Sequence, residues 1–131
     1  MERAEKAIEN HKKGYNCAQA VLCAFCDKTD FTEDQLFKIS EAFGGGMGGT
    51  QGVCGAVSAM VFLAGIEKSI GVENIPNTNK ANSYKFAREL MGEFYNKNKS
   101  IMCSELKGEN LRSCDGCIED AVKILEKYLN N

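Results

Sequence analysis

Apolar residues recur at helical spacing along most of this 131-residue chain, and this periodicity constrains the fold more than any other feature. No segment alternates with a period of two for long enough to require a strand. Asn16 with Gln19, and Thr32 with Gln35, have the capping-box spacing that marks helix starts. The longest predicted helices cover residues 2–12, 53–70, 80–96 and 114–129. We therefore expect a single domain over residues 1–131, an all-α bundle of five or six helices with a glycine-rich loop at residues 44–52.

The composition is that of a globular protein and argues against two classes of partner. Hydrophobic residues make up 44% of the chain and charged residues 26%. The net charge is −2 and no basic stripe is present, which argues against nucleic-acid binding. The longest apolar stretch, residues 53–66, is shorter than the ~20 residues needed to cross a bilayer, and the charged N-terminus does not resemble a signal peptide. We expect a cytoplasmic protein without a membrane or nucleic-acid partner.

Seven cysteines, against one histidine, are the residues best suited to chemistry. In a reducing cytoplasm this number indicates metal binding or redox work rather than structural disulfides, and an odd count argues against a fully paired framework. Several cysteines are predicted at or near helix starts, where unpaired N–H groups and the helix dipole favour a thiolate. They are Cys17, Cys54, Cys103 at the third helical position after a Ser100 cap, and Cys114. The alternative is that each cysteine serves as a small hydrophobe in a helical core.

Two C-x-x-C motifs differ in their predicted position on a helix. Cys114 and Cys117 lie at a helix start, and their spacing brings two sulfurs within reach of one metal or of each other. The βαβ pattern of thioredoxin-like enzymes is absent around them. Cys23 and Cys26 come late in their helix and point about 120° and about 180° away from Cys17, given ~100° per residue. The second motif is therefore expected to pack in the core or in an interface.

The glycine-rich loop formally matches the G-x-G-x-x-G pattern. A nucleotide-binding loop follows a strand, whereas a helix precedes this one, and no Lys-Ser/Thr pair ends it. Its glycines would instead let backbone amides approach a sulfur or a cluster, with plain flexible connection as the alternative. The candidate cofactor-binding positions are Gly44, Gly45, Gly46, Gly48 and Gly49. Haem is not expected because no C-x-x-C-H motif is present, and His11 is expected to be solvated.

Four segments together carry a resemblance to a known family. They are GYNCAQAVLCAF (14–25), FGGGMGGTQGVCGAVSA (43–59), CSEL (103–106) and CIEDAVKILEKYL (117–129). In this order they resemble the C_GCAxxG_C_C family of redox-active proteins, with Ala59 in place of the last glycine of the central motif. The resemblance implies a small, mainly helical redox protein whose signature cysteines are Cys17, Cys54, Cys103 and Cys117. A related domain in a multihaem cytochrome with an iron–sulfur centre implies a cluster on these four, with Cys114 able to replace Cys117.

Three functions remain open at this point. The first is a soft metal held by the four signature thiolates, an Fe–S cluster or alternatively zinc, used for electron transfer or redox sensing. The second is a thiol/disulfide oxidoreductase that uses Cys114 and Cys117, or Cys54 with one of them. The third is structural zinc in an interaction module. The redox partner and any substrate are not indicated, and an apolar face with Leu22, Phe25 and Cys26 would allow a homodimer.

Overall fold

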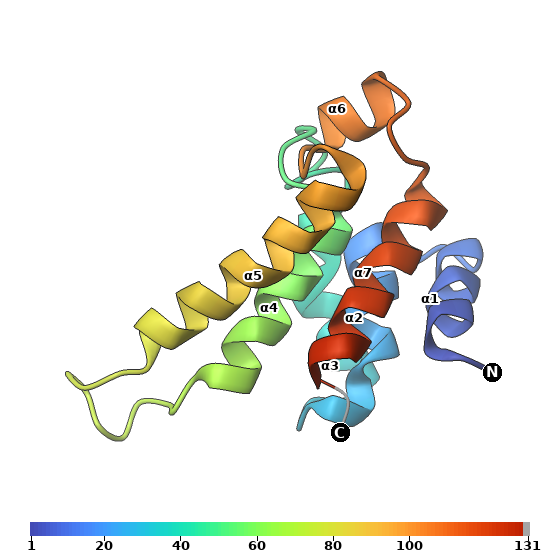
Figure 1. Cartoon of the computed structure of the whole chain (residues 1–131). Helices are drawn as coiled ribbons and strands as arrows, with labels where there is room; N and C mark the ends of the chain where they lie inside the picture. The colour runs from blue at the N-terminus through green and yellow to red at the C-terminus, as the bar shows by residue number, and fades with distance from the viewer. Residues whose placement is uncertain (130–131) are drawn as a thin grey trace.

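Seven α-helices and two short 3₁₀ helices form the computed structural model, which describes residues 1–129 (Figure 1). The α-helices are α1 (Arg3–Lys12), α2 (Cys17–Ala24), α3 (Glu33–Ser40), α4 (Gly55–Lys68), α5 (Lys80–Asn98), α6 (Cys103–Gly108) and α7 (Cys114–Leu129). The 3₁₀ helices are η1 (Cys26–Lys28) and η2 (Glu41–Phe43). The all-α prediction is confirmed. The predicted count of five or six is slightly low, since the described residues form seven α-helices.

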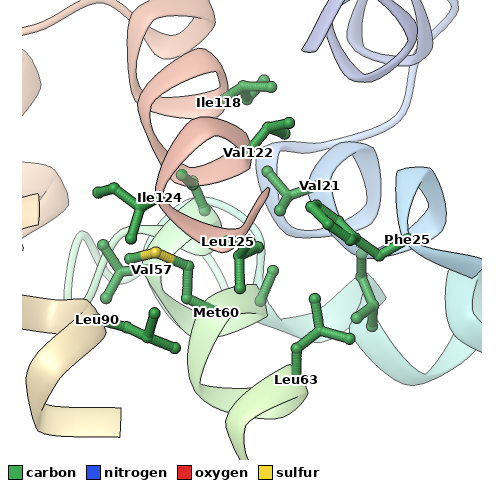
Figure 2. Close-up of a cluster of buried hydrophobic side chains, with 14 of the residues drawn as sticks. Val21, Phe25, Val57, Met60, Leu63, Leu90, Ile118, Val122, Ile124 and Leu125 are labelled. Carbon is green, nitrogen blue, oxygen red and sulfur yellow. The ribbon is translucent and has the colours of Figure 1, made fainter. Parts of the chain in front are cut away.

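The α2 helix lies at the centre of the bundle and packs against α1, α3, α4 and α7, while α5 packs mainly along α4. Apolar side chains from α2, α4, α5 and α7 meet between them (Figure 2). Leu22 is fully buried and Phe25 is 1% exposed, so both belong to this core. The prediction that they form an exposed apolar face was wrong, because α2 is surrounded by other helices. Cys26 is half-buried, and a homodimer stays a prediction.

The predicted helix starts agree with the structure except at α4 and α6, the two helices that begin next to Cys54 and at Cys103. The Asn16–Gln19 and Thr32–Gln35 capping boxes are both formed. The α4 helix begins at Gly55 rather than at residue 53, because Val53 pairs with Met102 in an isolated antiparallel bridge and Cys54 becomes the N-cap. Among residues 1–129, no helix combines the length and the apolarity needed to cross a membrane.

The glycine-rich loop contains five consecutive residues in the left-handed region, residues 45–49, with φ between 63° and 77°. Glycine adopts this conformation freely, whereas other L-residues are disfavoured there. The loop leads into a segment that pairs with the start of α6: Cys103 N–H donates to the Gly52 carbonyl at 2.7 Å, and Cys54 N–H donates to the Ile101 carbonyl at 2.8 Å. These bonds hold Cys54 and Cys103 side by side at one end of the bundle.

Candidate functional site

Five cysteines line one small cavity of about 20 Å³ at the end of the bundle that carries α6. They are Cys17, Cys54, Cys103, Cys114 and Cys117. The glycine loop and α6 lie at this end, far from the last turn of α7 (Figure 1). The remaining wall consists of Gly45, Gly46, Gly55, Leu106, Lys107 and Arg112. Since a water molecule needs about 10–15 Å³ of such space, the cavity has room for about one water-sized particle.

Each cysteine reaches the cavity from the first turn of a helix or from its N-cap. Cys17 is the first residue of α2, Cys54 is the N-cap of α4, and Cys103 is the first residue of α6. Cys114 and Cys117 lie in the first turn of α7. The structure thus brings together thiols that are far apart in the sequence, whereas their role as metal ligands stays a prediction.

The predicted register of Cys103 was wrong by two positions. Cys103 is the first residue of its helix rather than the third, because Met102 is the N-cap. Ser100 accepts a hydrogen bond from the Met102 N–H at 2.9 Å and donates one to the Glu105 carboxylate. The serine therefore stabilises the chain just before α6 without capping it directly, and Cys103 still lies at the helix start.

Cys54 is a thiol whose pKa is lowered by its surroundings. A hydrogen bond from the Cys117 thiol is the main reason that the pKa of Cys54 falls from 9.0 to about 7, against the opposing effect of burial. The backbone N–H groups of Ala56 and Val57 also donate to its sulfur, and the charge of Lys107 acts in the same direction. These donors are the unpaired N–H groups of the first turn of α4, which favour a thiolate.

The neighbouring thiols ionise less readily. Burial raises the pKa of Cys17 to about 12, helped by the negative charge of ionised Cys114 and Cys54. The pKa of Cys117 rises because its thiol donates to Cys54, and burial adds to this. Burial also raises the pKa of Cys103, which Lys107 partly offsets. Without a metal, the thiolate form is therefore favoured at Cys54 over Cys17, Cys103 and Cys117. A bound cation would reverse this balance, because coordinating thiols lose their protons.

The ionisation of Cys54 is coupled most strongly to the Cys117 thiol, and the ionisation of Cys17 is influenced by Cys114 and Cys54. All seven cysteines are free thiols. Within residues 1–129, no group of three or more Cys, His, Asp or Glu side chains is already spaced to hold a metal ion. Metal binding at this cavity would therefore require the thiols to turn towards a common position.

Only two of the five predicted loop glycines, Gly45 and Gly46, line the cavity; Gly44, Gly48 and Gly49 lie outside it. A side chain at residue 46 would place its Cβ 2.8 Å from the Cys103 Cβ, so glycine is required for the close approach of loop and α6. Gly44 has a different role, since a Cβ there would overlap the Asn16 side chain that caps α2.

Gly55 is a cavity residue that the sequence-based prediction did not single out. A Cβ at this position would lie 2.9 Å from the backbone nitrogen of Ala18 and 3.4 Å from the Cys17 Cβ. Its lack of a side chain lets the start of α4 approach the start of α2, which brings Cys54 towards Cys17. The glycine directly after Cys54 was the available signal.

The second C-x-x-C motif lies elsewhere. Cys23 is buried in the core and donates to the Glu33 carbonyl at 3.8 Å, whereas the half-buried Cys26 donates to the Phe31 carbonyl at 3.2 Å. Neither lines the cavity, so the prediction that this motif serves packing is confirmed. His11 is only partly solvated: its side chain is 29% exposed, and its Nδ1 lies 2.8 Å from the Asp115 carboxylate, because α1 packs against α7.

Fold and cavity together define a class: an all-helical protein with a buried group of thiols contributed by separate helix starts. The sequence profile of the family described as "Putative redox-active protein (C_GCAxxG_C_C)" matches residues 15–128. The chain therefore belongs to this family, and the matched range includes every cysteine of the cavity. No curated protein and no solved structure matches it.

Proposed function

We propose that this redox-active protein holds a thiolate-ligated Fe–S cluster on Cys17, Cys54, Cys103 and Cys117 and uses it for electron transfer or redox sensing. The observation that carries the proposal is that these four cysteines reach one cavity from four different helices or their N-caps. Thiolates are the soft ligands that iron–sulfur clusters and zinc prefer. Membership of a redox-active family favours iron over zinc, because zinc has no redox chemistry.

The cysteines of the cavity have the ligand atoms that an Fe–S cluster or a zinc ion requires. Whether the cavity is large enough depends on which of the two is bound. About 20 Å³ accommodates a single ion, whereas a cluster needs the thiols to move outward. Cys17 and Cys114 are half-buried, whereas the other three cavity cysteines are buried. When bound, the group would supply one-electron chemistry. The chain would hold its sulfurs, exclude water, and direct the N–H groups of Ala56 and Val57 at the Cys54 sulfur.

Two thiols compete for the fourth ligand position. Cys117 is 3% exposed and hydrogen-bonded to Cys54, which favours it. Cys114 is half-buried and pairs with Cys17 and Lys107. Serine variants distinguish them: we expect C117S to lose the centre and C114S to keep it. The opposite result would assign the ligand to Cys114.

Metal analysis of protein purified without oxygen tests the proposal. We expect a coloured protein that contains iron and acid-labile sulfide. Zinc without sulfide, together with a loss of stability on chelation, would assign the site to structural zinc instead. A colourless protein that neither contains nor takes up metal would reject the metal centre.

A second candidate function, a dithiol/disulfide oxidoreductase, is favoured by the hydrogen-bonded pair of Cys54 and Cys117. The Cys54 thiolate would attack a substrate disulfide, forming a mixed disulfide and releasing one substrate thiol. Cys117, after losing its proton to solvent, would then attack Cys54, releasing the second thiol and leaving a Cys54–Cys117 disulfide. Two electrons pass from the protein to the substrate.

A reductase-coupled disulfide assay tests this candidate. We expect activity that both C54S and C117S abolish and that C114S leaves intact. Activity that needs Cys114 but not Cys54 would assign the reaction to the Cys114–Cys117 pair instead. No activity in the wild-type protein would reject the candidate.

A further inference from the structure

Two cationic side chains, Lys107 and Arg112, line the thiol cavity, and their surroundings differ. The Arg112 guanidinium donates to the buried Asp120 carboxylate through Nε at 3.0 Å and Nη2 at 3.1 Å, and to Glu119 at 3.3 Å. Its charge is therefore largely compensated by carboxylates on α7. A side chain at Gly116 would overlap the guanidinium, so Arg112 lies directly against the turn between Cys114 and Cys117.

Lys107 follows Cys103 by four residues on α6, so both side chains lie on the same face of that helix. It lines the cavity together with Cys114, and its positive charge acts on the sulfurs of Cys114, Cys103 and Cys17. The ion pairs found among residues 1–129 do not include Lys107. In the described part of the chain, this exposed lysine therefore has no carboxylate partner of the kind that offsets the charge of Arg112.

We propose that Lys107 is the charge-compensating residue of the thiol cavity and sets its reduction potential. Ligand thiolates concentrate negative charge, and adding an electron increases it. A nearby cation stabilises the reduced form more than the oxidised form, because net charge at such a site is one of the quantities that fix its potential. Arg112 contributes less to this effect, since its charge is offset by Asp120 and Glu119. Lys107 is thus a positioning and tuning residue rather than a ligand.

This inference rests on the proposed function in one respect: it assumes that the thiol cavity is the redox site. It does not require that the site holds a metal. The same cation would favour the thiolate form of a metal-free dithiol, and hence its reduced state, so the sign of the effect is shared. Failure of the metal-centre proposal would therefore leave this inference testable on the thiols themselves.

The test is a redox titration of the wild-type protein and three variants, Lys107→Met, Lys107→Arg and Lys85→Met, with metal content measured in each. Lys85 provides a matched control, because it is exposed near the start of α5, away from α6 (Figure 1). We expect Lys107→Met to shift the ratio of oxidised to reduced protein about tenfold towards the oxidised form, which is ~59 mV for one electron. Lys107→Arg and Lys85→Met should stay within about twofold of wild type, the first because it keeps the charge.

The inference would be overturned if Lys107→Met kept its metal and showed the same ratio of oxidised to reduced protein as the wild type. If this variant lost the metal, or if the wild-type protein held none, the dithiol/disulfide equilibrium of the metal-free proteins would be compared instead. A shift of about tenfold towards the disulfide, ~30 mV for two electrons, is then expected in Lys107→Met. An unchanged equilibrium would reject the inference.

Discussion

The two C-x-x-C motifs of this chain have the same spacing and opposite surroundings. Cys114 and Cys117 occupy the first turn of α7 and line the thiol cavity. Cys23 is near the end of α2, and Cys26 lies beyond it in η1. Both of these thiols donate to backbone carbonyls. The pKa of Cys23 is raised to about 12, chiefly by burial, and the negative charge of Glu33 adds to this.

Attachment to the rest of the bundle does not distinguish the two motifs. Asp115, inside the first motif, pairs with His11, and Asp27, directly after the second, forms a two-point ion pair with Arg3. Both partners lie on α1. The difference is that the starts of α2, α4 and α6 lie next to the first motif, whereas none of them lies next to the second. The spacing identifies a pair of sulfurs, and the placement of the pair at a helix start, next to other helix starts, turns it into a candidate site.

The largest effect that would test this difference is expected from serine substitutions in the two regions. Cys54→Ser should reduce the metal bound per chain by more than about tenfold, because the cavity loses a ligand and its most acidic thiol. Cys26→Ser should leave it unchanged, because a hydroxyl can still donate to the Phe31 carbonyl. Metal analysis after anaerobic purification measures both. Equal metal content in the two variants would contradict the distinction between the regions.

A pair of glycine variants tests whether the close approach of the loop builds the cavity. Both Gly46 and Gly49 have a left-handed φ, 72° and 77°, so alanine should cost about 1–2 kcal/mol at either position. Only at Gly46 would the new Cβ also meet Cys103 and the backbone of residues 51 and 52, which adds about 1–3 kcal/mol. Urea unfolding measures the free energy of unfolding of both variants. Equal destabilisation would show that the contact with Cys103 is unimportant.

The pH dependence of stability should separate Cys54 from Cys23 in reduced, metal-free protein. The pKa of Cys54 is lower in the folded state, about 7 against 9.0, so ionised Cys54 favours folding above pH 9 and this contribution disappears as pH falls through 7. The full difference corresponds to about 2–3 kcal/mol. The pKa of Cys23 is higher in the folded state, so its contribution is present below pH 9 and is lost as pH rises towards 12.

Unfolding by urea at a series of pH values measures this dependence. In the wild-type protein, the free energy of unfolding should rise as the pH increases from about 7 to about 9, and Cys54→Ser should remove this rise. Cys23→Ser should reduce the fall in the free energy of unfolding at higher pH. Cys117→Ser should resemble Cys54→Ser in this window, although a serine hydroxyl can still donate to Cys54 and would keep part of the gain. A wild-type profile in Cys54→Ser would contradict the assignment of the acidic thiol.

The smallest effect is expected at the pair of His11 and Asp115. Both side chains are partly exposed, and such pairs are worth about 0.2–1 kcal/mol. His11→Ala should therefore lower the free energy of unfolding by less than about 1 kcal/mol and leave the metal content unchanged. Loss of the metal in this variant would show that α1 takes part in holding the site, which the present account does not include.

Local signals in the sequence were sufficient for the helices and for the two capping boxes, because N-cap chemistry acts within one turn of the chain. They also indicated which thiols lie at helix starts. They did not give the start of α4, because Val53 pairs with Met102, a residue that is distant in the sequence. The roles of Lys107 and Arg112 were missed because each depends on contacts between segments that no local pattern encodes, and the role of Gly55 was missed although it directly follows Cys54.

X-ray absorption at the metal edge of anaerobically purified protein tests the central claim most directly, because it reports the ligand atoms themselves. The account predicts an iron site coordinated by sulfur alone, with metal–sulfur distances near ~2.3 Å, a value known for zinc thiolates and expected to be similar for iron. It also predicts that Cys26→Ser gives the same spectrum as the wild-type protein. Nitrogen or oxygen as the principal ligands, or no bound metal, would contradict it.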